Sequence, residues 1–153
     1  MNKDKNLKAR PSSEDMRELE KLYQSNALET LIKKTKKMIR QYPHIANLFN
    51  ILGIALQKRG NNEEAIENFK EAINIKHDFD QAYNNLGNVF QNKGKFEDAI
   101  INYEKAIKFN PKYAEAYSNL GNSLTDLKRF EEALSNHYKA LELNPNLSEV
   151  YGN

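Results

Sequence analysis

Residues 80–113 read DQAYNNLGNVFQNKGKFEDAIINYEKAIKFNPKY and form one complete unit of a repeated pattern. The segments on either side repeat its pattern with a period of 34 residues, which separates Gly53 from Gly87 and Gly87 from Gly121. The other residues that return with this period are an aromatic residue (Phe49, Tyr83, Tyr117), a leucine (Leu52, Leu86, Leu120), two alanines (Ala65, Ala99, Ala133; Ala72, Ala106, Ala140) and a closing residue (His77, Pro111, Pro145). A fixed period of this length is the sequence signature of a stacked helical array.

The spacing within one unit predicts two antiparallel helices. Phe49, Leu52, Gly53 and Leu56 fall at i, i+3, i+4 and i+7, which is one face of an α-helix. The second half of the unit has apolar residues at the same spacing, with small alanines where two helices can cross closely. A glycine inside a helix costs up to ~1 kcal/mol of helix propensity. We therefore expect the second helix of the hairpin to approach the first one at Gly53.

These residues resemble the tetratricopeptide repeat family, whose aromatic–Leu–Gly, Ala–aromatic–Ala and terminal Pro places are filled through residues 46–147. The resemblance implies an all-α fold, a right-handed superhelical solenoid of antiparallel helix hairpins whose concave face is lined by the first helices. The departures are mild: Leu56 and Leu124 stand where an aromatic residue is usual, His137 replaces the aromatic residue of the second helix, and His77 replaces Pro.

The two ends of the chain fit the repeat less well. In residues 12–45, Glu18 and Leu19 occupy the Leu–Gly places, so we expect a degenerate first hairpin that acts as a cap, because terminal repeats are commonly atypical. The predicted organisation is a flexible basic tail (1–11), the degenerate hairpin or N-terminal cap (12–45), three tetratricopeptide repeats (46–79, 80–113, 114–147) and the truncated start of a further repeat (148–153).

A polar stripe runs along the face that the first helices should present to a ligand. Asn85 and Asn119 are one period apart, and so are Asn88 and Asn122. A carboxamide offers both donors and an acceptor, so a row of them can pair with the N–H and C=O groups of an extended peptide. The predicted peptide-binding residues are Asn50, Asn84, Asn85, Asn88, Gln91, Asn92, Ser118, Asn119, Asn122 and Asp126.

Two interpretations of this stripe stay open. The Asn run is similar to that of the protein O-linked N-acetylglucosamine transferase repeats, where it clamps substrate chains. The chain is also rich in Asn elsewhere, as at Asn61, Asn74 and Asn136, so the stripe could be an ordinary solvated face. A carboxylate clamp for chaperone C-termini needs Lys or Arg with Asn on this face. Only Lys58 is available there, and its place does not match the clamp.

Composition excludes several function classes. The chain has no Cys, which removes disulfides, thiolate metal sites and cysteine nucleophiles and suits a cytoplasmic location. His44, His77 and His137 have no metal-ligand spacing, and no phosphate loop or catalytic constellation occurs, so we expect no enzyme activity, no cofactor and no metal. The net charge of +2 and the lack of a long apolar run favour neither nucleic acid nor a membrane as a partner.

Residues 33–37 and Arg40 form a basic cluster. It could face phosphate or a membrane, but it is also the polar side of an amphipathic helix, where cations near the C-terminus complement the dipole. The second interpretation is favoured, because no aromatic residues alternate with these bases to stack on nucleotides.

The sequence therefore predicts a protein–protein interaction scaffold that binds an extended peptide or partner helix in the concave groove. The alternative is the N-terminal, substrate-recruiting part of a larger enzyme, either a glycosyltransferase like the O-linked N-acetylglucosamine enzyme or a sulfotransferase or oxygenase. A lesser possibility is self-association through the open C-terminal face. The sequence names neither the partner nor the pathway.

Overall fold

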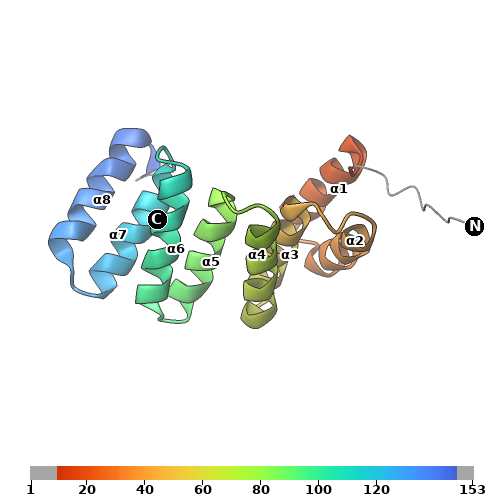
Figure 1. Cartoon of the computed structure of the whole chain (residues 1–153), viewed down its shortest axis with the longest axis horizontal. Helices are drawn as coiled ribbons and strands as arrows, with labels where there is room; N and C mark the ends of the chain where they lie inside the picture. The colour runs from red at the N-terminus through yellow and green to blue at the C-terminus, as the bar shows by residue number, and fades with distance from the viewer. Residues whose placement is uncertain (1–9, 148–153) are drawn as a thin grey trace, which may run out of the picture. The chain divides into compact units, whose positions relative to one another are not determined.

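The computed structural model describes residues 10–147, and within this range it consists of α-helices joined by short turns (Figure 1). Nearly all of the predicted basic tail and the whole predicted start of a further repeat lie outside the described residues. The eight helices of residues 10–147 are α1 (Ser13–Gln24), α2 (Leu28–Gln41), α3 (Ala46–Lys58), α4 (Asn62–Ile75), α5 (Asp80–Asn92), α6 (Phe96–Phe109), α7 (Ala114–Asp126) and α8 (Phe130–Leu143).

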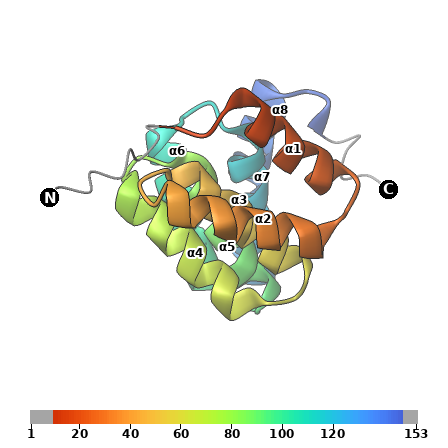
Figure 2. The same cartoon turned by 90° about the vertical axis from the view of Figure 1, so that its right-hand side faces the viewer.

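The chain divides into two compact units, residues 1–77 with α1–α4 and residues 78–153 with α5–α8. Within each unit every helix packs on the next one along the chain. Figure 2 shows the short turn that joins α1 to α2, and Figure 1 shows α7 running beside α8. The predicted all-α fold of antiparallel helix hairpins is therefore confirmed.

Each hairpin turn has one residue with a positive φ at the end of its first helix. Gly60 and Gly94 have φ values of +88° and +70°, Lys128 has +60° and Asn26 has +55°. The next residue then donates its N–H back to a carbonyl in the last turn of the first helix, as from Arg129 to Leu124 at 2.9 Å. For a residue with a Cβ this conformation costs about 1 kcal/mol. Lys128 and Asn26 carry this cost, whereas Gly60 and Gly94 do not.

An aromatic ring of the second helix lies against each framework glycine. A Cβ added to Gly53 would lie 2.6 Å from Cε1 of Phe69, and one added to Gly87 would lie 2.6 Å from Cε1 of Tyr103. Both rings are fully buried, so they have no room to move away. The close approach predicted at Gly53 is thus made by a ring, which explains why the sequence keeps a poor helix former there.

In the first hairpin the large and the small residue of this contact exchange places. Leu19 stands in the glycine place of α1 and is 1% exposed, while Thr35 stands in the aromatic place of α2 and is completely buried. The Thr35 hydroxyl donates to the Leu31 carbonyl at 2.7 Å, which satisfies its polar group inside the helix. A large residue on the first helix thus accompanies a small one on the second.

Candidate functional site

The ten predicted peptide-binding residues lie on α3, α5 and α7 and differ in how deeply they are buried. Asn84 is 1% exposed, and the nine others fall into buried, half-buried and exposed groups. The buried residues are Asn50, Asn84, Ser118 and Asn119, the half-buried residues are Asn85, Asn88 and Gln91, and the exposed residues are Asn92, Asn122 and Asp126.

Four of these side chains meet in a hydrogen-bond network with a buried tyrosine. Nδ2 of Asn119 on α7 donates to Oδ1 of Asn84 and to Oδ1 of Asn88 on α5, both at 3.1 Å. The Tyr103 hydroxyl on α6 lies 2.8 Å from Oδ1 of Asn88 and 2.7 Å from Oε1 of Gln91. The network therefore connects three consecutive helices of residues 78–147.

Burial divides the predicted ligand set into two groups. Asn50, Asn84, Ser118 and Asn119 are buried, although the sequence interpretation placed them on the face that meets a peptide. For Asn119 the physical reason is visible: both hydrogens of its amide nitrogen are used within the protein. Nδ2 of Asn84 is buried and has no hydrogen-bond partner in the structure. The residues that remain accessible for a ligand are Asn85, Asn88, Gln91, Asn92, Asn122 and Asp126.

Sequence analysis missed Tyr103, because it stands in a framework place of the repeat. The signal was available: the matching places hold Phe69 and His137, so only the middle full repeat has a phenol there. The Tyr103 ring performs the packing role of Phe69, and its hydroxyl adds a polar link to the first helix of the same hairpin.

Two of these amide places hold apolar residues in α3. Ile51 and Ile54 of α3 stand one period before Asn85 and Asn88 of α5. They line a cleft of about 430 Å³ between α1 and α3. The amino group of Lys58, the one basic residue considered for a clamp, lies 3.9 Å from the centre of the Tyr23 ring. The remaining residues that line the cleft are Met16, Arg17, Leu19, Glu20, Tyr23 and Asn47.

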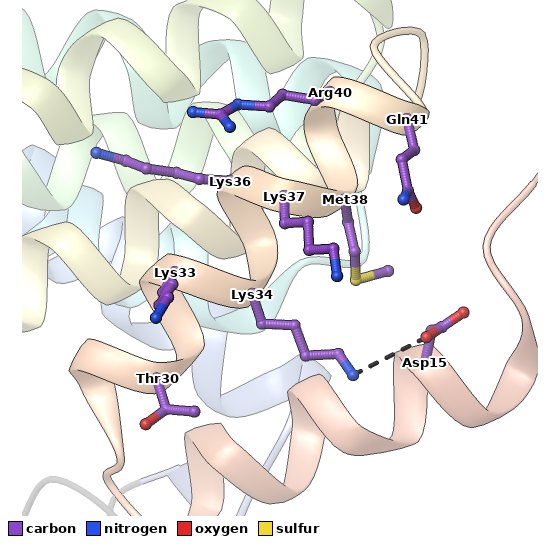
Figure 3. Close-up of a pocket in the computed structure, with 9 residues that line it drawn as sticks. All are labelled: Asp15, Thr30, Lys33, Lys34, Lys36, Lys37, Met38, Arg40 and Gln41. Atoms are coloured by element: carbon purple, nitrogen blue, oxygen red, sulfur yellow. Dashed lines mark ion pairs between the residues drawn. The ribbon is translucent and has the colours of Figure 1, made fainter.

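A second cleft, of about 640 Å³, runs along the basic side of α2 (Figure 3). Lys34 lies at its centre and pairs with Glu18 and, at 3.9 Å, with Asp15 of α1. Lys36 pairs with Glu64 of α4 at 3.6 Å. The cleft is lined by Asp15, Thr30, Lys33, Lys34, Lys36, Lys37, Met38, Arg40 and Gln41.

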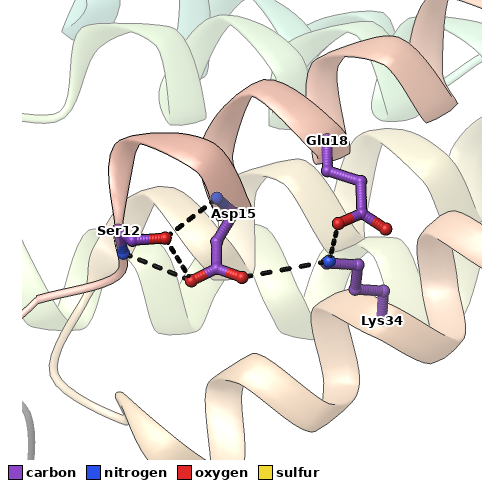
Figure 4. Close-up of polar contacts among 4 residues, drawn as sticks. All are labelled: Ser12, Asp15, Glu18 and Lys34. Carbon is purple, nitrogen blue, oxygen red and sulfur yellow. Dashed lines mark hydrogen bonds and ion pairs between the residues drawn. The ribbon is translucent and has the colours of Figure 1, made fainter.

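Figure 4 shows the two α1 carboxylates, Asp15 and Glu18, that pair with Lys34. The Ser12 hydroxyl accepts from the Asp15 N–H at 3.1 Å, and the Asp15 carboxylate accepts from the Ser12 N–H at 3.3 Å, which forms a capping box. The carboxylate that caps the helix therefore also faces Lys34. These ion pairs join α1 to α2, which agrees with the favoured interpretation of the cluster as the polar side of a helix.

Other chemistry has little support among residues 10–147. No group of three or more His, Asp or Glu side chains in this range could hold a metal ion. None of the helices found there is long and apolar enough to cross a membrane. The clearest electrostatic effect is a surface pair: the side-chain hydrogen bond with Arg129 lowers the pKa of Glu132 and raises the pKa of Arg129.

Helix hairpins with a 34-residue period, glycines covered by aromatic rings and short turns define a helical-repeat protein. The TPR repeat model matches residues 53–94 and 92–127, and the tetratricopeptide repeat model matches residues 114–147. These matches together span more than half of the 153 residues, and the chain belongs to the tetratricopeptide repeat family. Neither model is specific for repeats of the O-linked N-acetylglucosamine transferase type.

Solved structures give the same result. The crystal structure of MamA is similar with a TM-score of 0.78 and 25% identity, over 88% of this chain and 79% of MamA. The first TPR of Spaghetti (RPAP3), bound to the HSP90 peptide SRMEEVD, is similar with a TM-score of 0.67 and 26% identity, over 71% of this chain and 86% of that one. None of the curated proteins matches the sequence.

Proposed function

We propose that this chain is a protein-interaction scaffold, and that the amide face of α5 and α7 binds the main chain of an extended peptide. The observation that carries the proposal is the group of accessible carboxamides on the first helices of residues 78–147, above all Asn85, Asn88 and Gln91. A carboxamide can donate to a carbonyl and accept from an N–H, so it suits a peptide backbone of any sequence. A tetratricopeptide repeat with a bound peptide among the similar structures supports the same class of ligand.

The charge of this face argues against an acidic C-terminal peptide as the ligand. Neither α5 nor α7 contains a Lys or an Arg. A carboxylate terminus that lost its water there would have no cation to pair with, and burying an unpaired charge is costly. We therefore propose an internal, extended segment of a partner protein. Its affinity as a short peptide should be on the order of micromolar, because much of the interaction energy is spent on ordering the peptide.

A peptide selected on the wild-type protein from a random phage-displayed library tests this function. Replacement of Asn85, Asn88 and Asn122 with Ala should weaken binding of that peptide at least about tenfold, since two or more hydrogen bonds of about 1 kcal/mol each are removed. The matched control replaces Asn74, Asn136 and Asn146, which lie outside the first helices, with Ala and should bind normally. Fluorescence anisotropy gives the affinity, and circular dichroism shows that each variant is folded. Equal binding by both triple variants would remove the amide face as the site.

A separate observation supports self-association through α8. Phe130, Leu134, Tyr138 and Leu141 recur at helical spacing on this helix and are 57%, 54%, 65% and 39% exposed. In α6 the residue matching Leu134 is Ile100, which is buried in one cluster with Leu120 and Leu124 of α7. We propose that a second copy covers this face. Sedimentation of the wild type and of a Leu134→Glu variant tests it: the wild type should associate with rising concentration, and the variant should stay monomeric.

The alternative of a fragment that recruits substrates for an enzyme receives no support from the matched families and structures. A cytoplasmic location remains a prediction from the absence of Cys, and fractionation of cells that express the tagged protein would test it.

A further inference from the structure

The hydroxyl of Tyr103 links the packed core of the hairpin to the amide face. Its ring is completely buried against Gly87, and its oxygen lies within hydrogen-bond distance of Asn88 and Gln91, both half-buried on α5. These two residues are three positions apart on one helix, so their side chains are neighbours on its surface. The phenol therefore influences how these two amides are oriented on the face proposed to bind the peptide.

The phenol can donate only one hydrogen. Its oxygen lies 2.8 Å from Oδ1 of Asn88 and 2.7 Å from Oε1 of Gln91, and it cannot donate to both at once. Both contacts become hydrogen bonds when one amide turns its nitrogen toward the phenol and donates to the phenol oxygen. The oxygen and nitrogen of a carboxamide exchange places by a half-turn, so the hydrogen-bond network decides between them. One amide must then present its N–H groups outward, and the other must present its oxygen.

The Asn119 amide, in the orientation that it has in the structure, decides which of the two amides turns its nitrogen to the phenol. Its Nδ2 has two hydrogens and donates one to Oδ1 of Asn84 and one to Oδ1 of Asn88, each at 3.1 Å. Oδ1 of Asn88 is therefore held inside the network, and its N–H groups are left for the face. Gln91 is then the amide that turns its nitrogen to the phenol and presents Oε1 outward.

We propose that Tyr103 is a positioning residue that makes Asn88 a donor to a peptide C=O and Gln91 an acceptor from a peptide N–H. In an extended chain the N–H and C=O of one residue point to the same side, so this pair matches one residue of a peptide main chain. The inference rests on the proposed function and deepens it, because it assigns opposite roles to two amides. It also makes binding directional, since reversing the peptide exchanges its donor and its acceptor.

Tyr103→Phe is the test variant, and the chain itself indicates that it folds. Phe69 takes the same place against Gly53, with ring atoms 2.6, 2.8 and 2.9 Å from an added Cβ, compared with 2.6, 2.8 and 3.0 Å for Tyr103 at Gly87. Tyr23→Phe is the matched control, because this phenol is 39% exposed on α1 and lies on neither proposed binding face. Both variants lose one hydroxyl and keep the ring.

The first measurement needs no peptide. Side-chain amide resonances of Asn88 and Gln91 in nitrogen-15 spectra should shift in Tyr103→Phe and stay in place in Tyr23→Phe. Amide hydrogens of Gln91 should exchange with water faster once the phenol oxygen no longer accepts from them. Unchanged resonances and exchange in Tyr103→Phe would overturn the inference.

The second measurement uses the phage-selected peptide and a set of analogues, each with one backbone nitrogen methylated. In the wild type, methylation of the N–H that meets Gln91 should lower the affinity about fivefold, the worth of one hydrogen bond. Tyr103→Phe should bind the unmodified peptide about fivefold more weakly and should lose this sensitivity, whereas Tyr23→Phe should keep both the affinity and the sensitivity. If the wild type captures a peptide and Tyr103→Phe gives the same affinity and methylation profile, the inference alone is overturned. If the wild type captures no peptide, the proposed function is overturned together with it.

Discussion

The three full hairpins place different side chains against the same framework glycine. Phe69 covers Gly53, Tyr103 covers Gly87, and His137 covers Gly121, each with a ring atom 2.6 Å from an added Cβ. Phe69 and Tyr103 are fully buried, whereas His137 is only half-buried. The close packing is thus common to all three hairpins, and the polar group that the ring carries is what differs.

The face of the first helix changes together with the ring. Opposite Phe69, the helix presents Ile51 and Ile54 to an apolar cleft. Opposite Tyr103, it presents amides, and the phenol hydroxyl bonds to two of them. A residue that packs inside the hairpin can therefore also determine the polarity of the ligand face. Tyr103 thus contributes both to the fold and to the proposed binding site.

The largest effect on stability is expected at Gly87, where the buried Tyr103 ring cannot move away. Gly87→Ala should destabilise the protein by about 1–3 kcal/mol, because overpacking against the buried Tyr103 ring outweighs the gain of up to ~1 kcal/mol in helix propensity. Gly121→Ala should cost clearly less, because the half-buried His137 ring can turn away. Urea unfolding of the two variants measures the difference, and equal losses would show that the contacts at Gly87 and Gly121 are equivalent.

A smaller effect comes from moving the phenol link into the first unit. Phe69→Tyr alone should place a hydroxyl near Ile54 and Gln57, which stand in the places of Asn88 and Gln91. One of the two partners of the Tyr103 hydroxyl is then missing, which costs stability for a buried polar group. Combined with Ile54→Asn, the hydroxyl gains the partner that Asn88 supplies to Tyr103. The two substitutions should therefore couple favourably by about 0.5–1.5 kcal/mol in a double-mutant cycle. Strict additivity would mean that the link depends on more than these two places.

The turns offer a milder comparison. Gly60 and Gly94 adopt positive φ without a Cβ, whereas Lys128 adopts +60° with one. Lys128→Gly should stabilise the protein by about 0.5–1 kcal/mol, since the strain of about 1 kcal/mol is partly offset by the greater freedom of Gly in the unfolded chain. Thermal unfolding measures the gain. Gly94→Lys is the mirror control and should destabilise by a similar amount, and a loss of stability in Lys128→Gly would contradict the interpretation.

The period of Gly53, Gly87 and Gly121 predicts the helix hairpins because burial follows the 3.6-residue spacing, and this spacing is written in the sequence. The depth of the amides did not follow from it. Asn84 and Asn88 are four residues apart and share a helix face, yet Asn84 is buried and Asn88 is not. The difference arises from the side chains of the neighbouring helices, which the pattern of one helix does not contain. The role of Tyr103 could not be predicted from the sequence for the same reason, because its partners lie 12 and 15 residues away on another helix.

The smallest effect concerns the start of α8, where Arg129 donates to both carboxylate oxygens of Glu132 at 2.7 Å. This hydrogen bond lowers the pKa of Glu132. A carboxylate whose pKa is lower in the folded state adds stability above its ordinary pKa and loses it as the pH falls through the folded value. Arg129→Gln should therefore raise the pKa of Glu132 toward its ordinary value and reduce stability slightly at neutral pH but not at pH about 2. An NMR titration of the Glu132 carboxyl group checks the shift, and added salt should shrink the stability difference because both side chains are exposed. An unchanged Glu132 titration would contradict this prediction, because it would show that solvent screens the Arg129–Glu132 pair completely. The polar contacts that stabilise α5–α8 would then be the buried ones around Tyr103.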